Sequence, residues 1–95
     1  MAMHPELARL KASMMRNERA RLKCYKELET LYKSLGGEDI LPIEILFTTS
    51  WQDYINEHGT TANKQEASRL VENARIYYAR HNEAKSLYEW GLRHQ

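Results

Sequence analysis

Apolar residues recur along the first third of the chain with the 3.6-residue period of one face of an α-helix. No glycine or other proline interrupts the chain between Pro5 and Leu35, and proline is well tolerated in the first turn of a helix. Gly36 and Gly37 follow, and glycine commonly ends a helix because it readily adopts the left-handed conformation. The pattern predicts one long helix over about residues 5–35. Its buried stripe is expected to hold Leu7, Leu10, Met14, Tyr25, Leu28, Leu31, Tyr32 and Leu35.

A second amphipathic stretch of similar length occupies the last third of the chain. Thr60 or Thr61 provides an N-cap, no proline follows, and Gly91 comes only near the end. A second long helix is therefore predicted over about residues 61–93, and the two long helices are expected to pair as an antiparallel hairpin. The stripe that faces the first helix is expected to hold Ala67, Leu70, Val71, Ala74, Tyr77, Tyr78, Tyr88 and Leu92.

The segment between the two long helices, residues 38–59, has a less regular pattern. The run Ile40–Phe47 is compact and apolar, and it either begins a short helix at Pro42 or lies extended; we favour a helical turn. Ser50 with Asp53 three residues later resembles a helix N-cap, so a short helix is predicted over Trp51–His58 and is stopped by Gly59. The side of this helix that packs inward is expected to hold Trp51, Tyr54 and Ile55.

Length and composition allow one domain. The chain has 95 residues, of which 42% are hydrophobic and 28% charged, and its two prolines and four glycines argue against disorder. The expected fold is therefore all-α, with residues 1–95 as a single helical domain. It is a long antiparallel helical hairpin with a short helix and a compact apolar segment between the two long helices.

Polar residues interrupt both apolar stripes near their centres. In the first helix these are Asn17 and Arg21, and in the last they are His81 and Lys85. If the two helices pair with Leu35 near the start of the second, Asn17 comes opposite His81 and Arg21 comes opposite Tyr77. A polar layer inside a helical bundle usually fixes register or partner at a cost in stability, so we interpret these four residues as a structural layer.

Several apolar residues lie outside the stripes that two paired helices would bury. Two packed helices of about 45 Å would leave them in water, and the middle segment is too short to cover them all. We therefore predict either a homodimer that completes a larger bundle or a hydrophobic surface that docks on another protein. The residues assigned to this partner-binding surface are Met15, Leu22, Ile76, Leu87 and Trp90.

Positive charge is concentrated on the first helix although the net charge of the chain is only +1. Six basic residues align on the face opposite the apolar stripe. Such a row fits either an acidic protein surface or the phosphate backbone of a nucleic acid, and the absence of aromatic residues among its members weakens the second reading. This basic stripe consists of Arg9, Arg16, Arg19, Lys23, Lys26 and Lys33.

No pattern of residues predicts catalysis. The histidines and the single cysteine, Cys24, match no metal-ligand spacing, and Cys24 has no histidine nearby to act as its base. No glycine-rich phosphate loop is present. We therefore expect neither enzymatic activity nor a metal or other cofactor. One cysteine cannot form an intrachain disulfide, and no secretion signal or membrane-spanning run is visible, so a cytoplasmic location without membrane association is expected.

The preferred functional hypothesis is a small non-enzymatic helical protein-binding module, acting as an adaptor, inhibitor or regulator. Trp90, Leu87 and Ile76 would supply the desolvated anchor, since tryptophan is favoured at binding hot spots, and the basic stripe would speed and orient encounter. The alternative is a dimeric helical nucleic-acid-binding protein that uses the basic face of the first helix.

Overall fold

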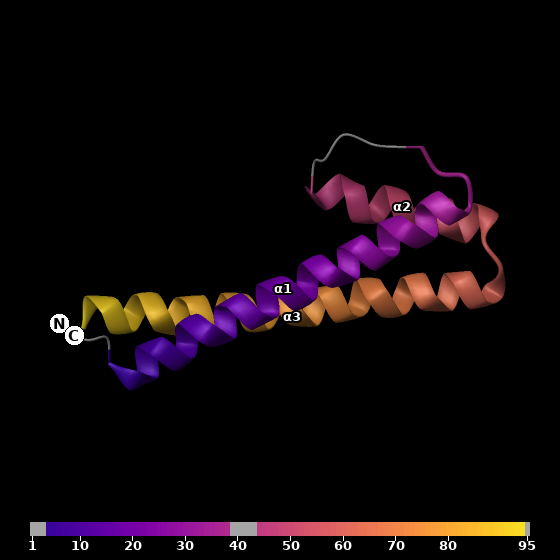
Figure 1. Cartoon of the computed structure of the whole chain (residues 1–95). Helices are drawn as coiled ribbons and strands as arrows, with labels where there is room; N and C mark the ends of the chain where they lie inside the picture. The colour runs from indigo at the N-terminus through magenta and orange to yellow at the C-terminus, as the bar shows by residue number, and fades with distance from the viewer. Residues whose placement is uncertain (1–3, 39–43, 95) are drawn as a thin grey trace.

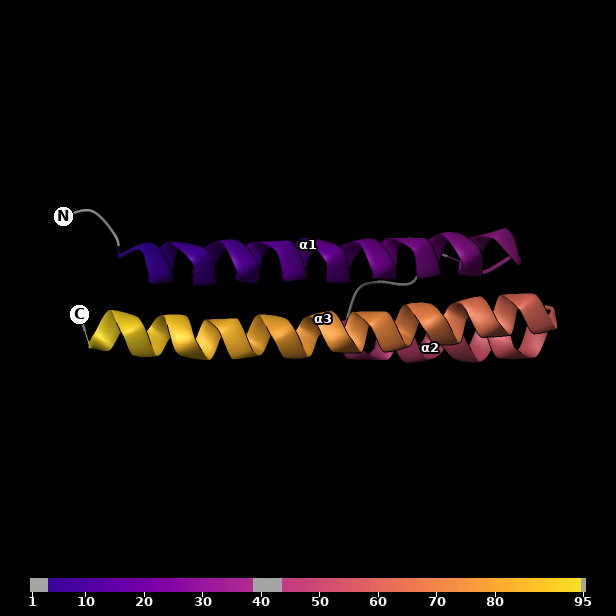
Figure 2. The ribbon, with the colours of Figure 1, turned by 90° about the horizontal axis from the view of Figure 1, so that it is seen from below.

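The computed structural model describes residues 4–38 and 44–94, with only the backbone described over 44–49. It contains α1 (Pro5–Ser34), α2 (Glu44–His58) and α3 (Thr61–Arg93), and no strand occurs among these residues. α1 lies obliquely across α3, and α2 packs beside them at the end of the molecule where α2 turns into α3 (Figures 1 and 2). The molecule measures 54 × 25 × 16 Å. The predicted all-α hairpin with a short helix between its two long helices is confirmed.

The two long helices meet along a seam with alternating steps of three and four residues. This spacing averages 3.5 residues and is typical of helices that pack as in a coiled coil. Every seam residue is buried or half-buried, as the spacing requires. The seam of α1 consists of Leu7, Leu10, Met14, Asn17, Arg21, Cys24, Leu28, Leu31 and Leu35, and that of α3 consists of Ala67, Leu70, Ala74, Tyr77, His81, Ala84, Tyr88 and Gly91.

Two residues that were assigned to the apolar stripe of the last helix lie outside the seam. Tyr78 is 49% exposed and Leu92 is 43% exposed, whereas Ala84, which the prediction omitted, is buried. Over four turns, a seam with a 3.5-residue period moves away from a stripe drawn at 3.6 residues per turn. The seam therefore passes through Ala84 and Gly91, and Tyr78 and Leu92 belong to a row beside it.

α2 begins earlier than predicted. The N-cap assigned to Ser50 is wrong, because the helix starts at Glu44 and Ser50 lies inside it. Residues 48–50, Thr-Thr-Ser, are indifferent helix formers, but Trp51 and Ile55 on the same helix are buried, and tertiary packing of one face supplies most of the stability of a helix. Residues 44–47 of the apolar run are helical, and the helix start considered at Pro42 lies outside the described residues.

The hydrophobic core lies where all three helices meet. Its buried members are Leu28 and Tyr32 of α1, Trp51 and Ile55 of α2, and Ala67 and Leu70 of α3. The ring centroid of Tyr32 lies 6.0 Å from that of Trp51 and 5.0 Å from that of Tyr54, and the Tyr54 hydroxyl donates a 3.2 Å hydrogen bond to the Leu35 carbonyl. The predicted inward side of the short helix is thus confirmed, with Tyr54 half-buried.

α2 divides the hairpin into two parts. We call the part packed against α2 the covered half; every α1 residue of the core lies at or after Leu28, and every α3 residue of the core lies at or before Leu70. The open half consists of α1 up to Leu22 and α3 from Ile76 onward, where only two helices pack together (Figure 1). His4 and His94, the first and last described residues, lie at the end of this open half.

Glycines and capping residues set the helix boundaries. Gly36 has φ 95°, the left-handed conformation that glycine adopts without strain, and its N–H donates a 3.0 Å bond to the Lys33 carbonyl. At the start of α3, the Thr60 hydroxyl accepts a 3.2 Å bond from the Asn63 N–H, and the Asn63 side chain accepts a 2.9 Å bond from the Thr60 N–H. This reciprocal pair satisfies two backbone donors and confirms the predicted cap at Thr60.

Replacing Thr60 by alanine is expected to lower the free energy of unfolding by about 1 kcal/mol, because the Asn63 N–H loses its capping partner. Urea denaturation followed by circular dichroism measures the change. Thr61→Ala is the matched control, since Thr61 is the exposed next residue and makes no side-chain hydrogen bond to the described part of the chain. Equal losses in the two variants would show that Thr60 does not act as the cap.

Candidate docking surfaces

Where the structure describes the side chains, the large apolar ones that are exposed all lie in the open half. Among the residues whose burial is described, seven such side chains have exposed fractions between 39% and 57%, and Trp90 has the highest. All five side chains assigned to partner binding are among them, so their predicted exposure is confirmed, while their docking role stays a prediction. The seven are Met15, Leu22, Ile76, Tyr78, Leu87, Trp90 and Leu92.

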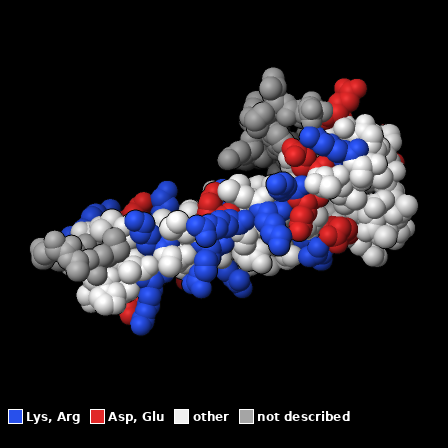
Figure 3. All heavy atoms as spheres, in the orientation of Figure 1, with Lys and Arg blue, Asp and Glu red and all other residues white. Residues whose placement is uncertain are grey.

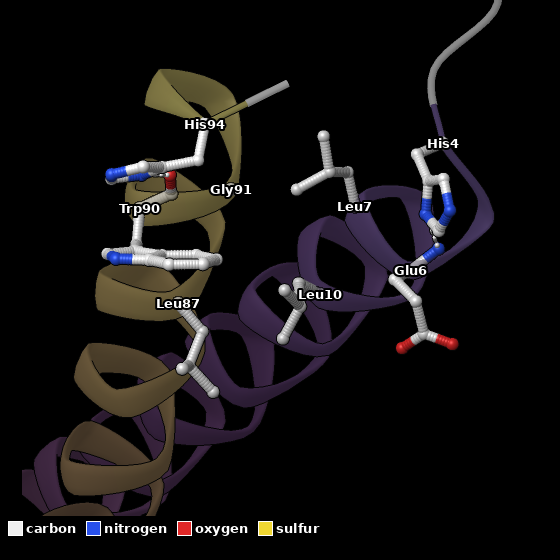
Figure 4. A pocket seen from close by; sticks show the side chains of 8 residues that line it. All are labelled: His4, Glu6, Leu7, Leu10, Leu87, Trp90, Gly91 and His94. Atoms are coloured by element: carbon white, nitrogen blue, oxygen red, sulfur yellow. Dashed lines mark hydrogen bonds between the residues drawn. The ribbon is translucent and has the colours of Figure 1, made fainter.

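One hollow lies at the terminal end of the open half. We call this cavity, of about 470 Å³, the terminal hollow. The Trp90 ring is stacked on the His94 ring with 4.3 Å between centroids and 21° between planes, and Leu87 lies one turn before (Figure 4). Leu7 packs against Gly91 at the base, where a larger residue would collide with it. The lining residues are His4, Glu6, Leu7 and Leu10 of the α1 end and Leu87, Trp90, Gly91 and His94 of the α3 end.

A second hollow, of about 310 Å³, lies between α1 and α3 on a different side of the hairpin. We call it the lateral hollow; its lining residues are Lys11, Met14, Met15, Glu18, Arg19, His81 and Tyr88. Leu22 follows Met15 by seven residues and so continues the same row of α1. Ile76 precedes Trp90 by fourteen residues and lies on the row of α3 that carries Trp90. The five predicted residues therefore belong to two faces and do not form one surface.

The polar layer that was predicted in the centre of the hairpin is present around Arg21. Its side chain is only 12% exposed and makes a 2.6 Å ion pair with Glu18, while Glu18 lies 3.6 Å from Nδ1 of His81. Burial works against the charge of the guanidinium, but the hydrogen bond and charge of Glu18, together with the contribution of Tyr25, outweigh it, so the pKa of Arg21 is raised. Nδ1 of His81 also lies 3.0 Å from the Met14 carbonyl oxygen, which ties α3 to α1.

One detail of the predicted layer is wrong. Lys85 is exposed, because it lies in the row of Tyr78 and Leu92 beside the seam. Asn17 is half-buried in the seam, as predicted, and its side chain donates within its own helix, to the Ser13 carbonyl at 2.8 Å. Arg21 was expected opposite Tyr77. Its guanidinium lies over the ring of the next residue, Tyr78, at 5.2 Å from the ring centroid.

Glu18 is the member of the layer that the sequence analysis missed. It is the single acid between residues 9 and 26, and it precedes Arg21 by three residues, the spacing at which helical side chains meet. This three-residue spacing is the feature of the sequence from which the pairing of Glu18 with Arg21 could have been predicted.

The basic stripe lies in solvent, and all six of its members are exposed. Arg9 pairs with Glu6 at 3.2 Å and Lys33 with Glu29 at 3.9 Å, both within α1. Arg16, Arg19, Lys23 and Lys26 make no ion pair with any residue that the structure describes. Figure 3 shows Lys and Arg side chains distributed along this face of the molecule. The middle of the stripe thus presents positive charge that other side chains of the described chain do not neutralise.

Cys24 lies in the seam and is buried, and burial raises the pKa of its thiol, which keeps it in the unreactive protonated form. Among the described residues, no group of three or more His, Cys, Asp or Glu side chains is placed to hold a metal ion. Nor does the described part of the chain contain a helix with the length and apolar character needed to cross a membrane.

Comparison with known proteins finds no matching family model, no matching curated protein and no matching solved structure.

Proposed function

We propose that this protein is a small non-enzymatic helical module that binds another protein through the apolar and basic surface of its open half. The observation that carries the proposal is the segregation of exposed apolar side chains. A third helix covers one half of the hairpin, and the other half keeps seven large apolar side chains in water. An exposed apolar surface of this kind, bordered by charged residues, is typical of a protein interaction site.

Of the two exposed apolar faces of the open half, the one at the terminal hollow supplies the anchor. Trp90 and Leu87 are more than half exposed, and they border a concave apolar site into which a partner side chain can insert. The basic stripe speeds and orients encounter with an acidic partner, because exposed charges act mainly on association rates. The proposed role is that of an adaptor, inhibitor or regulator that works in the cytoplasm by docking.

The second candidate is a dimeric nucleic-acid-binding protein. Four basic residues that make no ion pair with a described residue favour it, since they follow one another along the exposed face of α1: Arg16, Arg19, Lys23 and Lys26. Phosphate contacts release counterions, so the affinity for a short duplex would fall steeply with salt, and charge removal at Arg16 and Lys23 would flatten that dependence. A binding curve for a duplex that hardly changes with salt would leave this candidate without support.

The first proposal is tested at Trp90 and Leu87. A chain that carries a photoreactive residue in place of Leu87 is expected to cross-link to a discrete protein in a lysate of the cells from which the sequence comes. The same label in place of Asn56, an exposed residue of α2, is expected not to do so. Cross-linking only to further copies of the chain would indicate a homodimer instead.

With the cross-linked partner purified, Trp90→Ala is expected to raise the dissociation constant at least about tenfold, because tryptophan anchors in hot spots commonly contribute about 2 kcal/mol or more. Helical content measured by circular dichroism stays unchanged, since Trp90 is 57% exposed. Asn56→Ala serves as the control. An unchanged affinity in a folded Trp90→Ala variant would contradict the assignment.

A further inference from the structure

The lateral hollow continues the side of the hairpin on which α2 is seated. Tyr25 packs against the core that contains Trp51 and Ile55 of α2. The Arg21 guanidinium lies over the rings of both Tyr25, at 5.6 Å, and Tyr78, at 5.2 Å. Glu18 then joins Arg21 to His81, which lines the lateral hollow. An unbroken series of contacts thus leads from α2 to the hollow.

The sequence of α2 shows what kind of element this side of the hairpin accepts. The helix carries Glu44, Asp53 and Glu57 and contains no lysine or arginine. It buries Trp51 and Ile55, four residues apart on one face, against α1 and α3. The occupant in the covered half is therefore an acidic amphipathic helix of 15 residues.

The lateral hollow combines an apolar floor with positive charge at its rim, and no part of the described chain occupies it. Lys11 and Arg19 at its rim make no ion pair with a described residue. Its one carboxylate, Glu18, is already held by Arg21 at 2.6 Å. Exposed apolar side chains lie beside the hollow on both helices, Met15 and Leu22 on α1 and Tyr78 and Leu92 on α3, with Lys85 between the last two.

This charge distribution discriminates between occupants. A second copy docked by the same face would bring a second set of the positive charges of Lys11 and Arg19 into one interface, and like charges across an interface are destabilising. A nucleic acid would meet the positive rim but would leave Met15, Leu22 and Leu92 facing phosphates. A helix with acidic flanks and apolar residues on one face satisfies both features, in the helix-in-groove mode of recognition.

We infer that the lateral hollow is the docking site for an acidic amphipathic helix of another protein, seated beside α1 and α3 as α2 is seated in the covered half. The inference rests on the proposed protein-binding function and names the chemistry of the partner. The helix places apolar residues on Met15, Leu22 and Tyr78 and carboxylates against Lys11 and Arg19. A helix of about four turns, which spans about 22 Å, fits within the open half, where α1 extends for about 27 Å from Pro5 to Leu22.

The test uses the full chain and three fluorescently labelled peptides of 15 residues. The first has leucines at helical spacing i, i+3, i+4 and i+7 and glutamates between them, the second has lysine in place of every glutamate, and the third is a scrambled form of the first. Fluorescence anisotropy is expected to show that the acidic amphipathic peptide binds at least about tenfold tighter than either of the others.

Two pairs of variants locate the binding. Lys11→Glu with Arg19→Glu is expected to weaken binding at least about tenfold, whereas Arg16→Glu with Lys23→Glu makes the same change of charge on the same helix outside the hollow and is expected to weaken it much less. Met15→Ala with Leu22→Ala is expected to weaken binding as well, while Asn56→Ala on the exposed surface of α2 leaves it unchanged. All these residues are exposed or at the rim of a hollow, so the variants should fold, which circular dichroism verifies.

Several results would overturn the inference. If the scrambled peptide bound as tightly as the acidic amphipathic peptide, the binding would be unspecific charge attraction. The same would follow if the Arg16 and Lys23 variant lost as much affinity as the Lys11 and Arg19 variant. A mass of twice 11.2 kDa by light scattering that Met15→Glu returns to 11.2 kDa would assign the hollow to a second copy. Displacement of the acidic peptide by a short duplex that itself binds more tightly would assign it to nucleic acid. If the peptides fail to bind but the label at position 87 still captures a partner, the proposed function stands and only this inference fails.

Discussion

Leu28→Ala is expected to lower the free energy of unfolding by about 2–5 kcal/mol, because it opens a cavity where the three helices meet. Leu28 is 1% exposed and packs in the cluster that joins α1 to Trp51 and Ile55 of α2. A domain of this size has a total stability of about 5–15 kcal/mol, so a substantial part of the stability would be lost. Urea denaturation followed by circular dichroism measures the change.

Leu22→Ala is the matched control, since it is the same substitution six residues earlier on the same helix. Leu22 is 50% exposed and lies in the open half, so its removal is expected to change the free energy of unfolding by no more than about 0.5 kcal/mol. Comparable losses in the two variants would mean that Leu22 is covered in solution, as in a dimer. The comparison therefore checks both the position of the core and the exposure of the docking face.

Glu18→Ala is expected to have the second-largest effect, a loss of about 1–3 kcal/mol of unfolding free energy, because it leaves the guanidinium of Arg21 half-buried without its carboxylate. Arg21 is 12% exposed, and its buried Nε already has no hydrogen-bond partner among the described residues. Glu18→Gln retains an acceptor for Arg21 and is expected to lose less. Glu66→Ala removes a carboxylate that pairs with Arg69 on the exposed surface of α3, and it should leave stability nearly unchanged.

The double variant Arg21→Met with Glu18→Gln tests whether the ion pair between Arg21 and Glu18 makes a net contribution to the stability of the hairpin. Replacing both members of a buried ion pair by groups that need no partner is often neutral or stabilising, so the double variant is expected to be at least as stable as the wild type. A loss larger than that of Glu18→Ala alone would show that the pair makes a net contribution to stability. Thermal denaturation of the wild type, the two single variants Arg21→Met and Glu18→Gln, and the double variant, all at one concentration, gives the coupling free energy between the two positions.

The sequence predicts the architecture well because short, local sequence features mark the ends of the two long helices. Pro5, the Gly36-Gly37 pair and the cap at Thr60 each act within one turn of the backbone, and the observed ends agree with the prediction to within one or two residues. The start of α2 was not predictable in the same way. Its helical state at residues 48–50 depends on packing of Trp51 and Ile55 against helices that are distant in sequence.

The candidate site was predictable in its composition but not in its geometry. Periodicity shows that Met15, Leu22, Ile76, Leu87 and Trp90 leave the main stripe, and all five are exposed. The rotation of the seam along α3 decides which exposed residues share a face, and it also places Tyr78 and Leu92 beside the lateral hollow. That rotation follows from how α1 crosses α3, which no single stretch of sequence determines.

The antiparallel hairpin makes the sequence distance between contacting residues grow steadily along the molecule. Leu35 approaches Gly59 at the turn, whereas Leu7 approaches Gly91 across nearly the whole chain. Joining distant segments costs more chain entropy, and in the open half no third helix offsets that cost. The covered half can therefore form first, and the helix ends of the open half separate most easily. A partner that holds α1 and α3 together there would stabilise the end of the molecule that is hardest to close.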